Sequence, residues 1–356
     1  MKHAIIVGIV ISSLGALYVG SLYSVVIGSN TVPSVQGLAS FPAVDVDNEM
    51  RGFAAFSGGF TLATAATSCI FNSLYPVIGN MTMNGGILNL SRKLVLGNTA
   101  VFANGGRING NNYSLLLPNK ISTFSFPAAV MTFVDIAVQM NSDVALQALM
   151  TFTGVSVIDG QGYTLDCSSG SLAVGNGSSL ALRNLTLTGL SAGKMYCTDS
   201  LGTFSFDNVT CVLSNNYTFT QGKLDILGDL MCTGPYVFCY QSTRTSTIYS
   251  QASLAFDAGM TFSYNASVSG SLLAMADATA SLALYETTLY STVPGLNLTK
   301  GQLVVEGSCP VMSTASSSGN GIKLGDGSSA SNNLTISILE ESGLNLLSGF
   351  MVYQNV

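Results

Sequence analysis

The eight residues Ile158–Leu165 (IDGQGYTL) repeat, 50 positions later, the pattern of residues Ile108–Leu115 (INGNNYSL). A second phrase, Leu182–Thr186 (LRNLT), returns after 24 positions as Phe206–Thr210 (FDNVT). Self-similarity at roughly 20–50 residues is typical of solenoids, in which each repeat buries its apolar face against its neighbours. These phrases therefore indicate the fold class and say little about activity.

Nine pairs of the form apolar-x-apolar accompany the phrases. Their spacings from Leu180 onward run from 20 to 31 residues, and each pair has the alternation of a strand with one buried face. After residue 30 no stretch has a helical period of helix length. The pairs are Leu88/Leu90, Val144/Leu146, Leu180/Leu182, Phe204/Phe206, Leu224/Ile226, Leu254/Phe256, Leu282/Leu284, Leu303/Val305 and Leu334/Ile336.

Two all-β architectures accommodate such short strands. Asn-Gly pairs, such as Asn84-Gly85 and Asn109-Gly110, suit the hairpins of an antiparallel sandwich or barrel. A parallel β-helix instead stacks coils about 4.8 Å apart and places equivalent residues in register. Because a hairpin sandwich has no reason to reuse one phrase at coil spacing, we predict an all-β chain that forms a single parallel β-helix.

The repeats between residues 85 and 110 resemble those of a known group. The segments Gly85–Leu90 (GGILNL), Leu94–Gly97 (LVLG) and Gly105–Gly110 (GGRING) are similar to repeats of bacterial right-handed β-helix surface proteins. These proteins include autotransporter-passenger-like and pectate-lyase-like folds. The resemblance covers about residues 60–356. It implies a right-handed parallel β-helix and no particular activity.

The first 30 residues have the composition of an export signal. Lys2 and His3 precede the apolar stretch Ala4–Leu17, and the next charged side chain is Asp45. Since the uncharged stretch exceeds the ~20 residues that span a bilayer, an uncleaved anchor is the alternative. We therefore expect a signal peptide or anchor over residues 1–30, a linker and N-terminal cap over 31–60, and the β-helix over 61–356.

Charge is sparse throughout the chain. Charged residues make up 8% of the sequence, and the net charge is −6. The 12 Lys and Arg are scattered, so no basic patch is predicted for nucleic acid. Mean hydropathy is +0.46, which leads us to expect self-association or attachment to an envelope or host surface. Membrane contact is expected only through the N-terminal segment.

The acidic residues are the candidate catalytic groups of the sequence, because glycoside hydrolysis needs two carboxyl groups beside the scissile bond. We interpret them as turn or solvent-facing acids. Arg183 and Asp207 are the nearest candidates for lyase chemistry, and we expect them to form a surface ion pair between adjacent coils. The closest-spaced acids are Asp45/Asp47/Glu49 and Glu340/Glu341, whereas Asp159/Asp166 lie seven residues apart and Asp225/Asp229 four.

Two further motifs lack the partners that their chemistry requires. The nucleophile-elbow pattern Gly189–Gly193 (GLSAG) has neither a predicted helix nor a His in the main body, so we predict a glycine-rich turn. The seven Cys form no Cys-x-x-Cys pair, and we expect no zinc site. Cys211 and Cys232 are expected to stack on adjacent coils as buried small side chains, although some disulfide pairing stays open. No catalytic, metal-binding or cofactor-binding residue is assigned.

Asn184 and Asn208 occupy equivalent positions of the second phrase. They predict a ladder of side-chain amides inside a turn. Each also begins an Asn-x-Thr sequon, so glycosylation is an alternative that a buried ladder would exclude. Tyr113 and Tyr163 occupy equivalent positions of the first phrase, and we expect corner packing there, with a carbohydrate platform as the alternative.

These observations predict a structural or adhesive β-helix protein that is secreted or displayed on the cell surface, at the outer envelope, and that self-associates. The alternative is a polysaccharide lyase or glycoside hydrolase on the same scaffold. Carbohydrate is considered as a partner in both hypotheses.

Overall fold

The fold is taken from a computed structural model. Within the described ranges, side chains are described from Ile87 onward, apart from 96–102 and 124–125. The ranges described are 25–27, 43–44, 49–51, 56–62, 68–71, 77–83, 87–90, 93–102, 106–117, 124–125, 130–265, 273–292, 294–317, 321–325 and 334–354.

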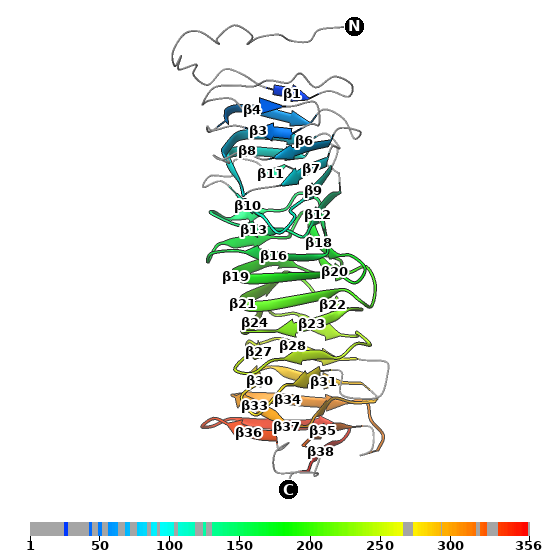
Figure 1. The fold of residues 1–356 in the computed structure, drawn as a ribbon. Coiled ribbons are helices and arrows are strands. Elements are labelled where there is room, and N and C mark those ends of the chain that lie inside the picture. Colours follow the sequence, from blue (N-terminus) through cyan, green and yellow to red (C-terminus); the bar gives the residue numbers. More distant parts are fainter. Residues whose placement is uncertain are drawn as a thin grey trace, which may run out of the picture.

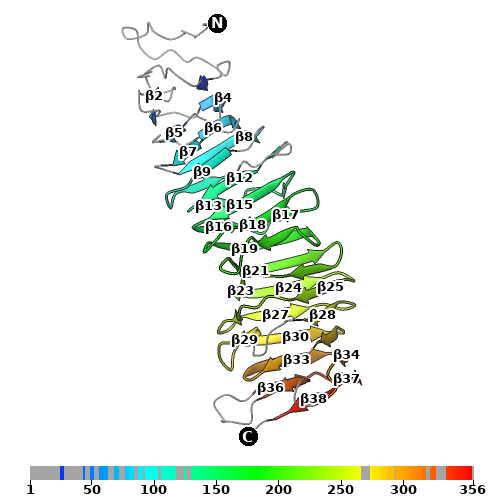
Figure 2. The ribbon, with the colours of Figure 1, turned by 90° about the vertical axis from the view of Figure 1, so that its right-hand side faces the viewer.

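The described chain is a parallel β-solenoid of about eight turns, in which every regular element is a strand. The strands stack along one axis, from β1 (Val25–Ile27) at one end to β38 (Met351–Tyr353) at the other (Figures 1 and 2). This stacking confirms the predicted all-β class and the parallel β-helix. Within the described residues, no helix could cross a membrane.

Each coil visits three faces in a fixed order. In one coil, β18 (Ser171–Val174) lies on the third face, and the bent strand β19 (Ser179–Leu190) then covers the first and second faces. The chain returns to the third face in β20 (Met195–Cys197), which pairs with β18 in parallel. The long strands β19 and β21 (Thr203–Leu213) join the first two faces into one 20-stranded sheet.

Strands of the first face are β10 (Ser114–Leu116), β13 (Ala137–Gln139), β16 (Val155–Asp159), β23 (Lys223–Ile226), β26 (Ser246–Ile248), β29 (Leu273–Met275), β32 (Asn297–Leu298) and β35 (Ile322–Leu324), followed by β38. Strands of the second face are β11 (Phe124–Ser125), β14 (Val144–Ala145), β17 (Thr164–Asp166), β24 (Asp229–Thr233), β27 (Ser253–Phe256), β30 (Ser281–Tyr285), β33 (Gly301–Glu306) and β36 (Leu334–Ile338). Nearer the N-terminus, these faces are formed by β1, β4 (Phe56–Leu62), β6 (Val77–Met83) and β8 (Leu94–Phe102).

Strands of the third face are β2 (Ala43–Val44), β3 (Glu49–Arg51), β5 (Ser68–Phe71), β7 (Ile87–Leu90), β9 (Gly106–Asn109), β12 (Met131–Val134), β15 (Leu149–Thr153), β18 and β20. They are followed by β22 (Tyr217–Phe219), β25 (Val237–Tyr240), β28 (Thr261–Tyr264), β31 (Thr288–Ser291), β34 (Ser308–Ser313) and β37 (Gly343–Ser348).

The core lies inside the coils, because alternate residues of each strand point inward. Leu180, Leu182, Leu185 and Leu187 of β19 are all buried. Register stacks like on like: Phe133 and Phe152 are partners on adjacent coils, with ring centroids 5.2 Å apart. Each fully buried Leu or Phe contributes roughly 1.5–3 kcal/mol, and stacked rings add about 0.5–1.5 kcal/mol. The core is therefore one continuous column.

The two copies of the first phrase form the same turn at different corners. In both, the fourth-position residue, Asn111 or Gln161, begins a two-residue turn of positive φ. Each turn is closed by a backbone hydrogen bond: the Tyr113 amide donates to Gly110 O, and the Tyr163 amide donates to Gly160 O. Leu115 is in register, through Val138, with Ile158. The two phrases therefore lie at successive corners of the solenoid, two coils plus one face apart. Tyr113 and Tyr163 do not stack on each other.

The nine apolar pairs do not form one series. All of their side chains are buried or packed against the core, as predicted, and all but Leu146, which follows β14, lie on strands. However, Leu88/Leu90 lie on the third face, Leu224/Ile226 on the first and Leu254/Phe256 on the second. The spacing of 30 residues between the last two pairs therefore combines a coil with a change of face. Leu334 is also in register with Gly301 rather than Leu303.

The predicted signal or anchor over residues 1–30 falls almost wholly outside the described residues. Of that segment only β1 is described, paired in parallel with β4. In the segment 31–60, β2 and β3 form an antiparallel pair, and β3 pairs in parallel with β5. The division of the chain at residues 30 and 60 stays a prediction.

Candidate functional site

A column of charged side chains runs up the end of the first face. Asp159, Arg183 and Asp207 are register partners on three successive coils. The Arg183 Nε lies 3.8 Å from Asp207 Oδ2, and both side chains are more than a third exposed. This confirms the predicted surface ion pair, which contributes under ~1 kcal/mol. Asp159 and Asp207 lie two coils apart, a separation of roughly 10 Å from the strand spacing.

The asparagine ladder is present beside this column. Asn208 Nδ2 donates to Asn184 Oδ1 at 3.4 Å, and Asn184 Nδ2 donates to Asp159 Oδ1 at 3.3 Å. Both Asn residues have positive φ, 49° and 57°, which lets one residue turn the chain from the first face to the second. The ladder was expected inside the turn, but both side chains are exposed. The reason is that the one-residue corner points its Cβ outward.

The other acids that the sequence singled out lie apart and bind neighbours. Asp159 ends a strand of the first face, and Asp166 ends a strand of the second. Asp225 Oδ1 lies 2.8 Å from Lys223 Nζ, and Asp229 Oδ1 accepts from Ser253 Oγ at 2.6 Å. Burial disfavours the charge of Lys223, but the hydrogen bond and charge of Asp225 outweigh it and raise the Lys223 pKa.

The remaining acidic groups lie near the two ends of the chain. Asp45 and Asp47 lie outside the described residues, and so does the Glu49 side chain. Glu340 and Glu341 are exposed in the turn between β36 and β37, where Glu341 has a positive φ of 60°. Glu340 and Glu341 therefore lie in a turn, as predicted, and Asp159, Asp166 and Asp229 lie at strand ends. Asp225 differs from the prediction, because it lies within β23 and its side chain is only 14% exposed.

The turn predicted at Gly189–Gly193 is present in part: Gly189 and Leu190 end β19, and the turn follows over residues 191–194. Gly189 has a φ of 71°, and the Lys194 amide donates to Ser191 O at 3.1 Å before β20 begins. A Cβ on Gly189 would overlap the backbone of Ser168 on the preceding coil. Glycine at this position therefore lets the backbones of adjacent coils pass close to each other.

Thiols line the interior of the solenoid. Cys211 and Cys232 are register partners on adjacent coils, and both are buried free thiols, as predicted for small core side chains. The hydrogen bond to Cys232, together with burial, raises the pKa of Cys211. Burial also raises the pKa of Cys167 to about 12. A buried protonated thiol is a poor nucleophile and a poor metal ligand.

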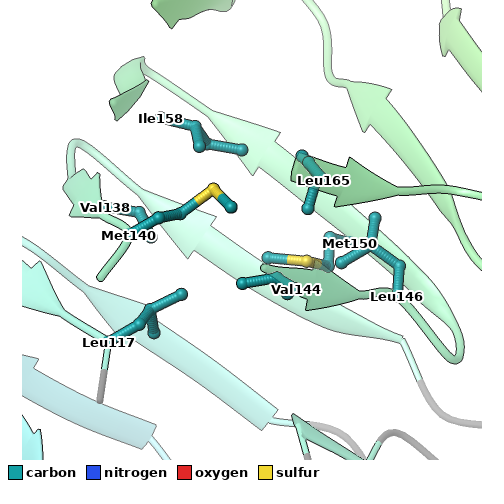
Figure 3. Close-up of a pocket in the computed structure, with 8 residues that line it drawn as sticks. All are labelled: Leu117, Val138, Met140, Val144, Leu146, Met150, Ile158 and Leu165. Carbon is teal, nitrogen blue, oxygen red and sulfur yellow. The ribbon is translucent and has the colours of Figure 1, made fainter. Parts of the chain in front are cut away.

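An apolar cavity lies inside the coils near residues 117–165 (Figure 3). The side chain of Met140, directly after β13, and that of Met150, in β15, reach into it. Its free space holds about one water molecule, and no polar side chain lines it, so it suits neither water nor a polar ligand. The lining residues are Leu117, Val138, Met140, Val144, Leu146, Met150, Ile158 and Leu165.

Several exposed apolar side chains lie on the coil over residues 334–353, which the sequence did not predict. Its inward-facing side chains remain open: Ile338 is 52% exposed, Leu346 45% and Tyr353 55%. Their register partners one coil earlier, Val305, Val311 and Leu324, are at most 2% exposed. Leu339, Leu347 and Phe350 add further exposed apolar area to the same coil.

Tyr113 and Tyr163 are each about two-fifths exposed, at 42% and 40%, on two different corners. They lie two coils and one face apart, so the two rings do not form a ladder.

No protein-family model, curated protein or solved structure matches this chain.

Proposed function

We propose that this chain is a structural or adhesive protein, secreted or displayed on the cell surface, that self-associates through its β-solenoid. One observation carries the structural role: the polar motifs of the described corners are used to hold coil on coil. Asp159, Asn184 and Asn208 form the ladder, and Arg183 pairs with Asp207. These side chains therefore have a structural role, because they bind one another between adjacent coils.

The proposed location has its support in the sequence. A short polar start followed by a long uncharged stretch over residues 4–30 is the composition of an export signal. A similarity of the repeats to bacterial β-helix surface proteins agrees with it, and an outer envelope or host surface is the proposed place of attachment. Carbohydrate is a proposed partner there.

Fractionation of the producing cell, with N-terminal sequencing of the recovered chain, tests the location. Recovery from the medium, or from the cell surface by brief external proteolysis, supports the proposal. Recovery from the cytoplasm with Met1 intact contradicts it. A cytoplasmic protein expressed in the same cells serves as the leakage control.

A second candidate, an enzyme on the same scaffold, is favoured by the Asp159–Arg183–Asp207 column. A hydrolase with an interposed water has its carboxyl groups ~6.5–9.5 Å apart, close to the two-coil separation. The column lies on an exposed corner, and the ladder uses Asp159. If the purified chain cleaves an acidic polysaccharide, activity should disappear in Asp159→Ala/Asp207→Ala. Activity that survives this double substitution removes the column from catalysis.

A further inference from the structure

We infer that Asn176 is a site of spontaneous deamidation, at which the neutral side-chain amide converts to a carboxylate as the folded chain ages. This modification goes beyond the proposed function and does not depend on it. The evidence is the difference between two Asn-Gly pairs, Asn176-Gly177 and Asn109-Gly110, which share the same reacting atoms. A glycine in second place favours the reaction, because no Cβ hinders its backbone nitrogen.

The reaction takes place within the chain and needs only water. The backbone nitrogen of Gly177 attacks Cγ of Asn176, and the new N–Cγ bond closes a succinimide ring. The Cγ–Nδ2 bond breaks, and ammonia leaves with the proton of the attacking nitrogen. Water then opens the ring at one of its two carbonyl groups. Cleavage of the N–Cγ bond gives Asp, and cleavage of the bond from this nitrogen to the main-chain carbonyl gives isoaspartate.

The atoms that react at Asn176 are free. Asn176 and Gly177 are both exposed in the turn between β18 and β19, which the Ser178 amide closes by donating to Gly175 O at 3.1 Å. Among the described residues, no hydrogen bond engages the Asn176 side chain or the Gly177 backbone amide. A Cβ on Gly177 would meet no atom within 4 Å. The Asn176 side chain can therefore turn toward the attacking nitrogen without breaking a contact.

The same atoms at Asn109 are held in place. Asn109 Nδ2 donates to Asn89 Oδ1 on the preceding coil at 2.6 Å, and Asn109 Oδ1 accepts from Arg107 Nε at 2.6 Å. The Gly110 amide donates to Val134 O on the next coil at 2.7 Å. Attack at Asn109 therefore requires local opening that breaks these hydrogen bonds, and the free energy of this opening slows the reaction.

Deamidation changes the corner at Asn176 in two ways. Both products replace a neutral amide with a carboxylate, in a chain whose net charge is −6. Isoaspartate also routes the main chain through Cγ, which lengthens the turn. Ser178 follows directly, and its Oγ accepts from the Gly154 amide on the preceding coil at 2.9 Å. We therefore expect this hydrogen bond between the two coils to weaken as isoaspartate forms.

Incubation of the purified full chain at mildly alkaline pH, with peptide mass spectrometry at intervals, tests the site. Fragmentation assigns each deamidated peptide to its Asn and distinguishes Asp from isoaspartate. In the folded chain, we expect Asn176 to deamidate at least ~10-fold faster than Asn109, which reacts only after local opening. Both rates should rise with pH, because the attacking nitrogen must lose its proton.

Two controls separate the effect of the fold from the effect of the dipeptide. In guanidinium chloride that unfolds the chain, Asn176 and Asn109 should react at similar rates, since nothing then holds Asn109. Asn176→Gln adds one methylene to the side chain, which disfavours ring closure. In this variant residue 176 should stay unmodified while Asn109 behaves as in wild type, and circular dichroism checks that the variant is folded.

Two results would overturn the inference. One is a folded chain in which Asn176 reacts no faster than Asn109. The other is a difference of the same size after unfolding, which would assign it to the neighbouring residues in the sequence rather than to the fold. Neither result bears on the proposed location.

Discussion

The coil over residues 301–324 and the coil over residues 334–353 are built from the same alternation of apolar and polar residues. Yet Val305 and Val311 of the first are fully buried, while their register partners Ile338 and Leu346 are about half exposed. The difference lies in the neighbours: the first coil is covered on both sides and the second on one. In a solenoid, burial is a property of the stack. Predictions that compare the two positions can break this account or sharpen it.

The largest difference is expected between truncations of Phe256 and Leu346. Phe256 is fully buried, and its ring lies 4.4 Å from that of Phe262. Phe256→Ala should lower the free energy of unfolding by about 3–5 kcal/mol, whereas Leu346→Ala should cost the monomer under ~1 kcal/mol. Urea unfolding followed by circular dichroism measures both. Equal losses would mean that the coil over residues 334–353 is as tightly packed as the interior.

A smaller difference is expected between two glycines. Gly189→Ala adds a Cβ against the Ser168 backbone at a φ of 71°, so it should cost roughly 2–3 kcal/mol. Gly343, at the start of β37, has no atom within 4 Å of an added Cβ, so Gly343→Ala should change stability by under ~0.5 kcal/mol. Thermal melting of both variants checks this. A harmless Gly189→Ala would contradict the close approach of coils at that corner.

Substitution of a corner asparagine should lower the free energy of unfolding by less still. Asn208→Ala keeps a residue at positive φ while removing the amide that donates to Asn184, so we expect a loss of roughly 1 kcal/mol. Asn208→Gly also removes the amide but tolerates the φ, so its loss should be smaller. Urea midpoints separate the two causes. If both variants lose the same stability, the hydrogen bond rather than the backbone conformation dominates at this corner.

The smallest effect is expected in the alkylation of interior thiols. At about pH 8 they should react very slowly with an alkylating agent, because the thiolate is the reacting form. Burial raises the pKa of Cys167 and Cys197 to about 12, so both stay protonated below that pH. Cys239 is half-buried and should react first. Peptide mass spectrometry measures the order. Rapid labelling of Cys167 in the folded chain would show that the coils open readily.

Much of this architecture follows from the sequence, because coil spacing brings equivalent residues into register. The 24-residue spacing of Arg183 and Asp207 was enough to predict their ion pair. Spacing did not reveal the face on which a pair lies, since all three faces share one alternation. Alternation also does not reveal a shift of two residues within one face, so Leu334 of β36 was aligned with Leu303 of β33 rather than with its partner Gly301. The exposed apolar side chains of the coil over residues 334–353 were also missed. In the sequence, Ile338 looks the same as Val305, and only the stack distinguishes them.

Hydrogen exchange tests most directly the claim that neighbouring coils protect one another. The strands β33 and β34 pair with strands on both sides, so their backbone amides should exchange slowly in the dilute chain. The amides of β36 and β37, whose apolar side chains Ile338 and Leu346 are about half exposed, should exchange much faster. Equal exchange rates in the two coils would contradict the account.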